Sequence, residues 1–267
     1  MFDLSAYLLG FAVMLGLAAV TWLVSLVKRD VSIVDSMWSI FFLAAALVYA
    51  GAHPEVAPRN ALVLVLVVVW ALRLAGYLTW RNWGEPEDHR YQKIRANNQP
   101  HFALKSLYLI FGLQAALAWV VSLPLLAAIA SSRPLGLFDY AGAALAVFGI
   151  LFETIGDWQL ARFKANSANR GRVLDTGLWR YTRHPNYFGE CCVWWGFYLI
   201  ALSAGGWWSV VAPLLMTLLL LKVSGVAMLE RDIGERRPAY RDYIARTNAL
   251  LPGPPRAGHS AARVANH

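Results

Sequence analysis

The sequence has little charge and almost no cysteine. Charged residues make up 15% of its 267 residues, whereas a soluble domain has roughly 25%, and this excludes an ordinary soluble enzyme. Cys191 and Cys192 are adjacent and cannot link distant segments, so they predict neither a disulfide framework nor a zinc site, and we expect no metal. Only Asp3 precedes the first apolar run and no small-residue cleavage motif closes it. We therefore expect a membrane span there and not a cleaved signal peptide.

Apolar residues make up 58% of the chain and gather into runs of about twenty. Each run is long enough to cross about 30 Å of hydrocarbon as a helix. The sequence therefore predicts an all-α membrane protein with seven transmembrane helices, at about 5–27, 31–51, 61–80, 105–129, 137–157, 186–204 and 207–229. We expect a single domain over residues 1–252 and a disordered cytoplasmic tail over 253–267.

The basic residues are distributed very unequally between the two sides of this arrangement. Of the 24, 20 lie on one side, at Lys28, Arg29 and in the segments 81–105, 158–185 and 229–267. Because cytoplasmic loops are rich in Lys and Arg, the N-terminus is predicted outside and the C-terminus in the cytoplasm. This asymmetry accounts for most of the net charge of +8, and anionic lipid or an anionic cofactor accounts for the rest, so we expect no nucleic-acid partner. No internal repeat is evident, which argues against a transporter of inverted halves.

Six charged residues fall inside or at the ends of the predicted spans, where each needs a partner or a cavity. They are Asp35, Arg73, Glu153, Asp157, Glu190 and Lys222. Helical spacing places Trp70, Arg73, Tyr77 and Arg81 in one stripe of the third span. In the fifth span the same spacing puts Glu153 and Asp157 on one face, which Lys164 continues if the helix extends that far. These polar residues enter from the cytoplasmic side and predict a pocket for an anionic cofactor with ribose groups.

Several of these charges also have a simpler interpretation. Lys222 lies near a span end, where its side chain can reach the interface. Arg73 can serve as a structural partner of Asp35 or Asp157, and Glu153 can join two helices by a hydrogen bond.

The most distinctive segment is GLWRYTRHPNYFGE, residues 177–190, which leads into the sixth span. Pro185 suits the first turn of that helix, where free backbone N–H groups favour an anion. The other side chains of interest can contact phosphate (Arg180, Arg183, His184), bind an amide or hydroxyl (Asn186) or stack on a ring (Trp179, Tyr181, Tyr187).

This segment, with the downstream Glu230 and the ending YIARTNALLP at 243–252, resembles the membrane-embedded steroid reductases. More closely, the chain resembles bacterial steroid 5α-reductases over most of its length, most strongly from Glu153 to Pro252. A shorter form of the motif, Arg-His-Pro-x-Tyr-x-Gly, is also found in isoprenylcysteine carboxyl methyltransferases and sterol Δ14-reductases.

The resemblance implies NADPH-dependent reduction of the Δ4 double bond of 3-oxo-steroids, or of a related lipophilic enone, inside the membrane. Asn186 and Glu190 match residues that hold the nicotinamide end, and Arg172, Asp157 and Lys164 match residues that hold the adenosine portion. Arg73 and Tyr77 match an Arg and a Tyr of the family's third span. With the residues noted above, the predicted cofactor site consists of Arg73, Tyr77, Arg81, Asp157, Lys164, Asn166, Arg172, Trp179, Tyr181, His184, Asn186, Tyr187 and Glu190. Such a site needs no glycine-rich Rossmann turn, because the family binds its dinucleotide between membrane helices.

The chain departs from the family at the group that binds the substrate ketone. The eukaryotic reductases have a Gln-Glu pair on the second span and a Tyr on the third, whereas this chain has Val34-Asp35 and Trp70. Asp35 is one candidate for the catalytic donor, and Tyr91 of the segment EDHRY is the other.

Two other functions compete with this one. One is an S-adenosylmethionine-dependent methyltransferase of the isoprenylcysteine type, and the other is a non-enzymatic lipid-binding membrane protein. We expect a monomeric, multi-pass protein of a bacterial-type inner membrane, whose cofactor site opens to the cytoplasm. The preference for NADPH over NADH stays open at this point.

Overall fold

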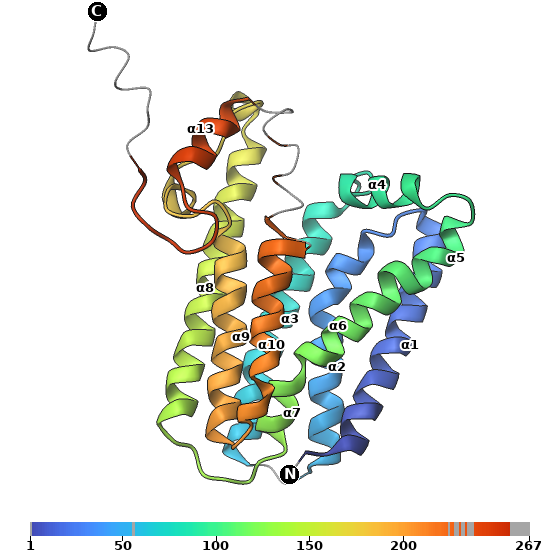
Figure 1. Ribbon diagram of the computed structural model, residues 1–267, viewed down its shortest axis with the longest axis vertical. Coiled ribbons are helices and arrows are strands. Elements are labelled where there is room, and N and C mark those ends of the chain that lie inside the picture. Colours follow the sequence, from blue (N-terminus) through green and yellow to red (C-terminus); the bar gives the residue numbers. More distant parts are fainter. Residues whose placement is uncertain are drawn as a thin grey trace, which may run out of the picture. The chain divides into compact units, whose positions relative to one another are not determined.

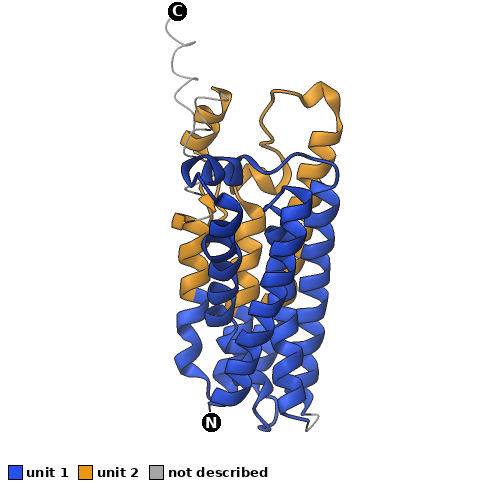
Figure 2. Ribbon diagram, turned by 90° about the vertical axis from the view of Figure 1, so that its right-hand side faces the viewer, with its two compact units in different colours: residues 1–144, 196–213 blue, residues 145–195, 214–267 orange. Residues whose placement is uncertain are grey.

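The computed structural model describes residues 2–54, 57–223, 225, 226, 230, 233 and 238–256. In this part of the chain all regular structure is helical, as predicted. The chain divides into two compact units (Figure 2): unit 1 is Met1–Ala144 with Gly196–Pro213, and unit 2 is Leu145–Trp195 with Leu214–His267. The predicted disordered tail lies outside the described residues from residue 257 onward.

Unit 1 is a group of apolar helices and a short polar helix, α4 (Figure 1). The helices wholly within it are α1 (Leu4–Lys28), α2 (Ile33–Ala52), α3 (Pro58–Asn82), α4 (His89–Asn97), α5 (Phe102–Ser106), η1 (Leu107–Gly112), α6 (Leu113–Val121), α7 (Leu123–Ile129) and η4 (Trp207–Val210). α2 packs against both α1 and α3, α6 packs against α1 and α2, and α7 packs against α2 and α3.

Unit 2 contains most of the helix α8, the first half of α9, and the C-terminal segments. α8 is Leu137–Ala165, α9 is Pro185–Ser203 and α10 is Val211–Leu218; all three begin or end in unit 1. The other elements are η2 (Ser167–Asn169), η3 (Gly177–Arg180), η5 (Leu219–Val223) and α13 (Ala239–Arg246). α8 continues to Ala165 and therefore includes Lys164, which is the condition on which Lys164 was expected to continue the face of Glu153 and Asp157.

Five helices are long and apolar enough to cross a membrane: α1, α2, α3, Phe102–Val121 and α8. They coincide with the first five predicted spans and indicate an integral, multi-pass membrane protein. The sixth predicted span forms the 19-residue helix α9, and the seventh includes the shorter apolar helix Trp207–Val223. Side chains such as Leu8, Val20 and Val65 are exposed on their helices, as expected of helices that face lipid.

Local sequence determines where several helices begin. The Asp3 carboxylate accepts a hydrogen bond of 3.0 Å from the backbone N–H of Ala6 and caps α1. Pro58 and Pro185 occupy the first turns of α3 and α9, where a missing N–H costs nothing. Asp88 caps α4 by accepting from the backbone N–H of Arg90 at 2.9 Å. The predicted position of Pro185 is confirmed.

Glycines let α8 and α9 approach closely in unit 2. A Cβ on Gly149 would lie 2.5 Å from the carbonyl oxygen of Gly189, and one on Gly189 would lie 2.6 Å from Cγ of Glu153. Neither position accepts a side chain without moving a helix. This contact fixes Glu153 against the turn of α9 that begins the polar motif.

A buried arginine joins three segments of unit 1. Arg59, in the first turn of α3, and Asp139, in the first turn of α8, are both fully buried and form an ion pair of 2.7 Å. The guanidinium also donates to the backbone carbonyls of Arg133 and Pro134, and Ser203 Oγ donates to Asp139 at 2.5 Å. The pair is stable in a dry environment because further hydrogen bonds satisfy both charges.

Candidate functional site

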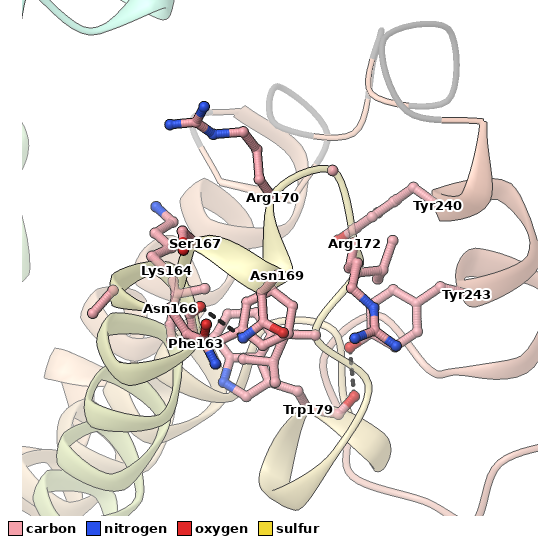
Figure 3. A pocket seen from close by; sticks show the side chains of 15 residues that line it. Phe163, Lys164, Asn166, Ser167, Asn169, Arg170, Arg172, Trp179, Tyr240 and Tyr243 are labelled. Atoms are coloured by element: carbon pink, nitrogen blue, oxygen red, sulfur yellow. Dashed lines mark hydrogen bonds between the residues drawn. The ribbon is translucent and has the colours of Figure 1, made fainter.

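An open, cationic pocket lies at the end of α8 in unit 2 (Figure 3). Its volume is about 380 Å³. The lining residues are Leu160, Phe163, Lys164, Ala165, Asn166, Ser167, Asn169, Arg170, Gly171, Arg172, Val173, Leu174, Trp179, Tyr240 and Tyr243. Four of the predicted cofactor residues are therefore brought together: Lys164, Asn166, Arg172 and Trp179.

The indole of Trp179 supports this pocket from inside the unit. Trp179 is buried, and its Nε1–H donates to the backbone carbonyl of Gly156 at 3.0 Å. The Tyr243 hydroxyl of α13 donates to the Trp179 carbonyl, so the C-terminal helix and η3 hold each other. The backbone N–H of Leu178 donates to Gln159 Oε1 at 3.0 Å and fixes η3 against α8. The aromatic part of the pocket is thus positioned before any ligand arrives.

The loop after α8 is held by a series of short turns. Asn166 Oδ1 accepts from the N–H of Ala168 at 3.0 Å, and Asn169 Nδ2 donates to the Phe163 carbonyl at 3.0 Å. The N–H of Arg170 donates to the Ser167 carbonyl, and that of Arg172 to the Asn169 carbonyl. These bonds order a loop that would otherwise be expected to move.

The charge of the pocket has one sign. Lys164, Arg170 and Arg172 are exposed in it, and none of its described lining residues is acidic. Guanidinium and ammonium groups bind phosphate oxygens, and the rings of Trp179 and Tyr240 offer faces for a flat base. The chemistry of the pocket suits an aromatic group that carries phosphate.

The Arg-His pair of the motif binds groups of the protein itself. Both Arg183 Nε and His184 Nε2 contact Glu230 Oε1, at 2.7 and 2.8 Å. Arg183 also donates to the carbonyls of Ile244 and Thr247 at the end of α13. Burial by itself raises the pKa of the Glu230 carboxyl, but hydrogen bonds from His184 and Arg183 lower it to about 2. Arg183, for which the sequence suggested phosphate, here holds the C-terminal segment in place.

The pKa of Glu230 predicts a dependence of stability on pH. A carboxyl whose pKa is lowered by folding stabilises the protein above its unfolded value, near 4.5, and loses that effect as the pH falls toward 2. Glu230→Gln should therefore unfold at a lower temperature than the wild type at pH 7, with a difference that shrinks between about pH 4.5 and pH 2. Thermal melts in detergent measure this, with the exposed Glu85→Gln as control. A constant difference across this range would contradict the assignment.

Asn186 is the motif residue whose side chain is left with an unused acceptor. Its Oδ1 is buried and has no hydrogen-bond partner among the residues that the structure describes. A buried amide oxygen without a partner costs about 1–3 kcal/mol, and a ligand N–H removes that cost. Glu190, one turn further along α9, is buried, as are Glu153 and Asp157 on α8. These polar residues lie in unit 2 but do not line the pocket.

The remaining motif aromatics lie in different surroundings. Tyr187 stacks on the His184 ring, with centroids 5.2 Å apart and planes 8° apart. Tyr181 is exposed, and its carbonyl accepts from the backbone N–H of Gly253. Neither lines the pocket.

In unit 1, the two residues predicted to be catalytic are in direct contact. The Tyr91 hydroxyl donates to Asp35 Oδ1 at 2.5 Å, and Arg90 donates to Asp35 Oδ2 at 2.6 Å. Arg90 also forms a 3.0 Å ion pair with Asp88, the cap of α4. Tyr91 is buried, and burial followed by the nearby Asp35 charge raises the pKa of its phenol well above the usual value of 10. Arg90 is thus a counter-ion of Asp35, a role for which the sequence offered Arg73 as a candidate.

The polar stripe of α3 is confirmed as a local cluster. The guanidinium groups of Arg73 and Arg81 each lie 5.9 Å from the centre of the Tyr77 ring. Such contacts are favourable by about 0.5–1 kcal/mol where they are exposed. This stripe belongs to unit 1.

Comparison with known proteins identifies the family. The profile of a family described as "Protein of unknown function (DUF1295)" matches residues 21–247. The chain belongs to this family. An uncharacterized protein of Schizosaccharomyces pombe, C594.04c, is 25% identical to this DUF1295 chain over 281 residues, which cover 94% of the chain and 81% of that protein. No solved structure matches.

Among the pocket residues of this DUF1295 protein that the sequence did not predict are Arg170, Tyr240 and Tyr243. Arg170 lies in the segment 158–185, whose mixture of basic, amide and aromatic residues was the available signal. Tyr240 and Tyr243 come from a helix some seventy residues later, and only the fold brings them to the pocket. The sequence also did not predict that Arg90, in the EDHRY segment, is an ion-pair partner of Asp35.

Proposed function

We propose that this protein is an NADPH-dependent reductase that reduces a carbon–carbon double bond conjugated to a ketone, in a 3-oxo-Δ4-steroid or a related lipophilic enone. The observation that supports the proposal best is the pocket of unit 2, with its three cations and its aromatic wall. The resemblance of residues 177–190 to the steroid 5α-reductases is the second support. We propose further that the protein crosses the membrane seven times, with its N-terminus outside.

The residues of unit 2 fit this cofactor. Lys164, Arg172 and Asn166 offer charge and hydrogen bonds for the adenosine end, and Trp179 offers a ring. Asn186 presents a buried oxygen that needs a donor, and a carboxamide N–H is such a donor. When bound, NADPH supplies a hydride for the β-carbon of the enone, and a proton for the α-carbon completes the reduction. The stripe of Arg73, Tyr77 and Arg81 in unit 1 stays a separate prediction for the same cofactor.

For the ketone we propose Tyr91 as the donor and Asp35 as a positioning residue. Both oxygens of Asp35 already accept hydrogen bonds, from Tyr91 and Arg90. The phenol has one O–H, which donates to Asp35 in this structure; we propose that it turns to the ketone oxygen when the substrate binds, while Arg90 continues to hold Asp35.

Ligand-induced stabilisation tests the proposal and separates it from the alternatives. The protein in detergent should melt at a higher temperature with NADPH and at an unchanged temperature with S-adenosylmethionine. The pocket favours this outcome because its three cations repel a sulfonium and attract phosphates. The purified protein should then consume NADPH with progesterone or testosterone, and the product should be two hydrogen atoms heavier. Stabilisation by S-adenosylmethionine alone would favour the methyltransferase, and stabilisation by neither would favour a lipid-binding protein.

Asn186→Ala should raise the NADPH dissociation constant about 10- to 100-fold, because it removes the amide oxygen offered to the cofactor. Titration calorimetry measures the constant. The matched control is Asn97→Ala, an exposed asparagine of α4, which should leave affinity unchanged. Wild-type affinity in Asn186→Ala would remove this residue from the cofactor site.

A further inference from the structure

The pocket of unit 2 has a cation that the resemblance does not explain. The resemblance assigns roles to Lys164 and Arg172 but none to Arg170, whose side chain lines the same pocket. NADPH and NADH differ by a single phosphate monoester on the adenosine ribose. A third cation in an adenosine pocket is therefore a candidate for the group that distinguishes the two cofactors.

The pocket is the size of one nucleotide and not of two. Its volume of about 380 Å³ lies near the lower end of the roughly 300–1,000 Å³ typical of small-molecule sites. Trp179 and Tyr243 are buried in its wall and Tyr240 is half-buried, so the exposed aromatic surface suits one base. A dinucleotide would thus place one of its halves here, and a fragment that consists of that half should bind by itself.

The cations are divided between two sides of the pocket. Figure 3 shows Arg170 at the rim, with its guanidinium on the side where Lys164 stands, and Arg172 across the pocket beside Tyr243. The loop bonds from Arg170 N–H to Ser167 and from Arg172 N–H to Asn169 hold the two arginines at fixed places in the turn. Between them Gly171 has φ of +82°, a left-handed conformation that glycine adopts without strain.

A phosphate monoester is the ligand that suits Arg170 and Lys164. It carries about −1.5 to −2 charge at pH 7, more than one phosphate of a dinucleotide bridge. Arginine binds such a group through two parallel N–H bonds, and a neighbouring ammonium adds charge. We propose that Arg170, together with Lys164, binds the 2′-phosphate of NADPH and makes the protein select NADPH over NADH. This inference rests on the proposed function and assigns one part of the same site.

The test compares Arg170→Met with Arg162→Met. Both arginines are exposed, but Arg162 lies over the Trp158 ring at 5.4 Å and does not line the pocket. Calorimetry in detergent would measure binding of NADPH, NADH, 2′,5′-ADP and 5′-ADP. Arg170→Met should lower affinity for NADPH and 2′,5′-ADP about 10- to 100-fold and leave NADH and 5′-ADP within about twofold. Arg162→Met should match the wild type for all four.

Several results would overturn the inference. If wild type binds NADPH and Arg170→Met retains that affinity, or loses NADH equally, Arg170 is not the selecting residue, although the proposed function stands. Arg170 is likewise not the selecting residue if inorganic phosphate binds the wild type as tightly as 2′,5′-ADP does, because the pocket would then bind anions in general. If wild type binds neither dinucleotide, the proposed function and this inference fail together. Arg170→Lys, which keeps the charge but not the paired N–H groups, should give an intermediate loss for NADPH.

Discussion

Tyr91→Phe is expected to lower kcat for enone reduction by about 10²- to 10⁴-fold, the usual contribution of a positioned proton donor. The substitution removes the hydroxyl that now donates to Asp35 and keeps the ring, over which the Arg90 guanidinium lies at 5.4 Å. NADPH affinity should change by less than about twofold, because the proposed cofactor residues of unit 2 are untouched. Steady-state kinetics with a saturating enone and a separate binding titration measure the two effects.

Tyr108→Phe is the matched control for this variant. Tyr108 is an exposed tyrosine of η1 in the same unit, so its hydroxyl should be dispensable. Wild-type kcat in Tyr91→Phe would rule out the phenol as donor. A fall in melting temperature without a fall in kcat would show that the Tyr91–Asp35 bond only stabilises α4.

Arg183→Met is expected to destabilise the protein by about 3–5 kcal/mol, since it removes one partner of a buried ion pair. The substitution keeps an apolar stem, removes the guanidinium and leaves Glu230 with His184 alone. The carbonyls of Ile244 and Thr247 lose their donors at the same time. Thermal melting should show the loss, and hydrogen exchange should show it most strongly in α13, which these bonds hold.

Arg180→Met provides the comparison, because Arg180 is exposed in η3 only three residues away. It should change stability by no more than about 0.5 kcal/mol. Adding Glu230→Gln to Arg183→Met should cost less than the sum of the two single changes, since the second removes the unpaired charge. A purely additive result would mean that the two side chains do not act as a pair.

The helices could be predicted because membrane-spanning helices are recognisable from local composition. The runs that became α1, α2, α3 and α8 are continuous in the sequence, and their ends differ from the predicted ends mainly where a polar turn extends a helix. α8 is the main example: apolarity ends near Asp157, but the helix continues to Ala165. The breaks among η1, α6 and α7 were not visible, since composition does not change across them.

The site could be predicted less completely, because partners come from distant segments. Spacing found the Arg73–Tyr77–Arg81 stripe, which lies on one helix. Spacing could not show that Glu230 accepts hydrogen bonds from Arg183, which lies 47 residues earlier. The motif therefore favours phosphate as the partner of Arg183, whereas the hydrogen bonds of Arg183 are to the protein's own chain.

The buried pair of Arg59 and Asp139 has a consequence for how the protein is made. The two residues are separated by 80 positions, and chains are synthesised at about 5–20 residues per second. Arg59 therefore enters the membrane with α3 roughly 4–16 s before its partner exists. During that interval its charge must stay hydrated at the membrane surface. The pair can close only after Asp139 has been made, so the first turn of α8 supplies the carboxylate that allows Arg59 to be buried.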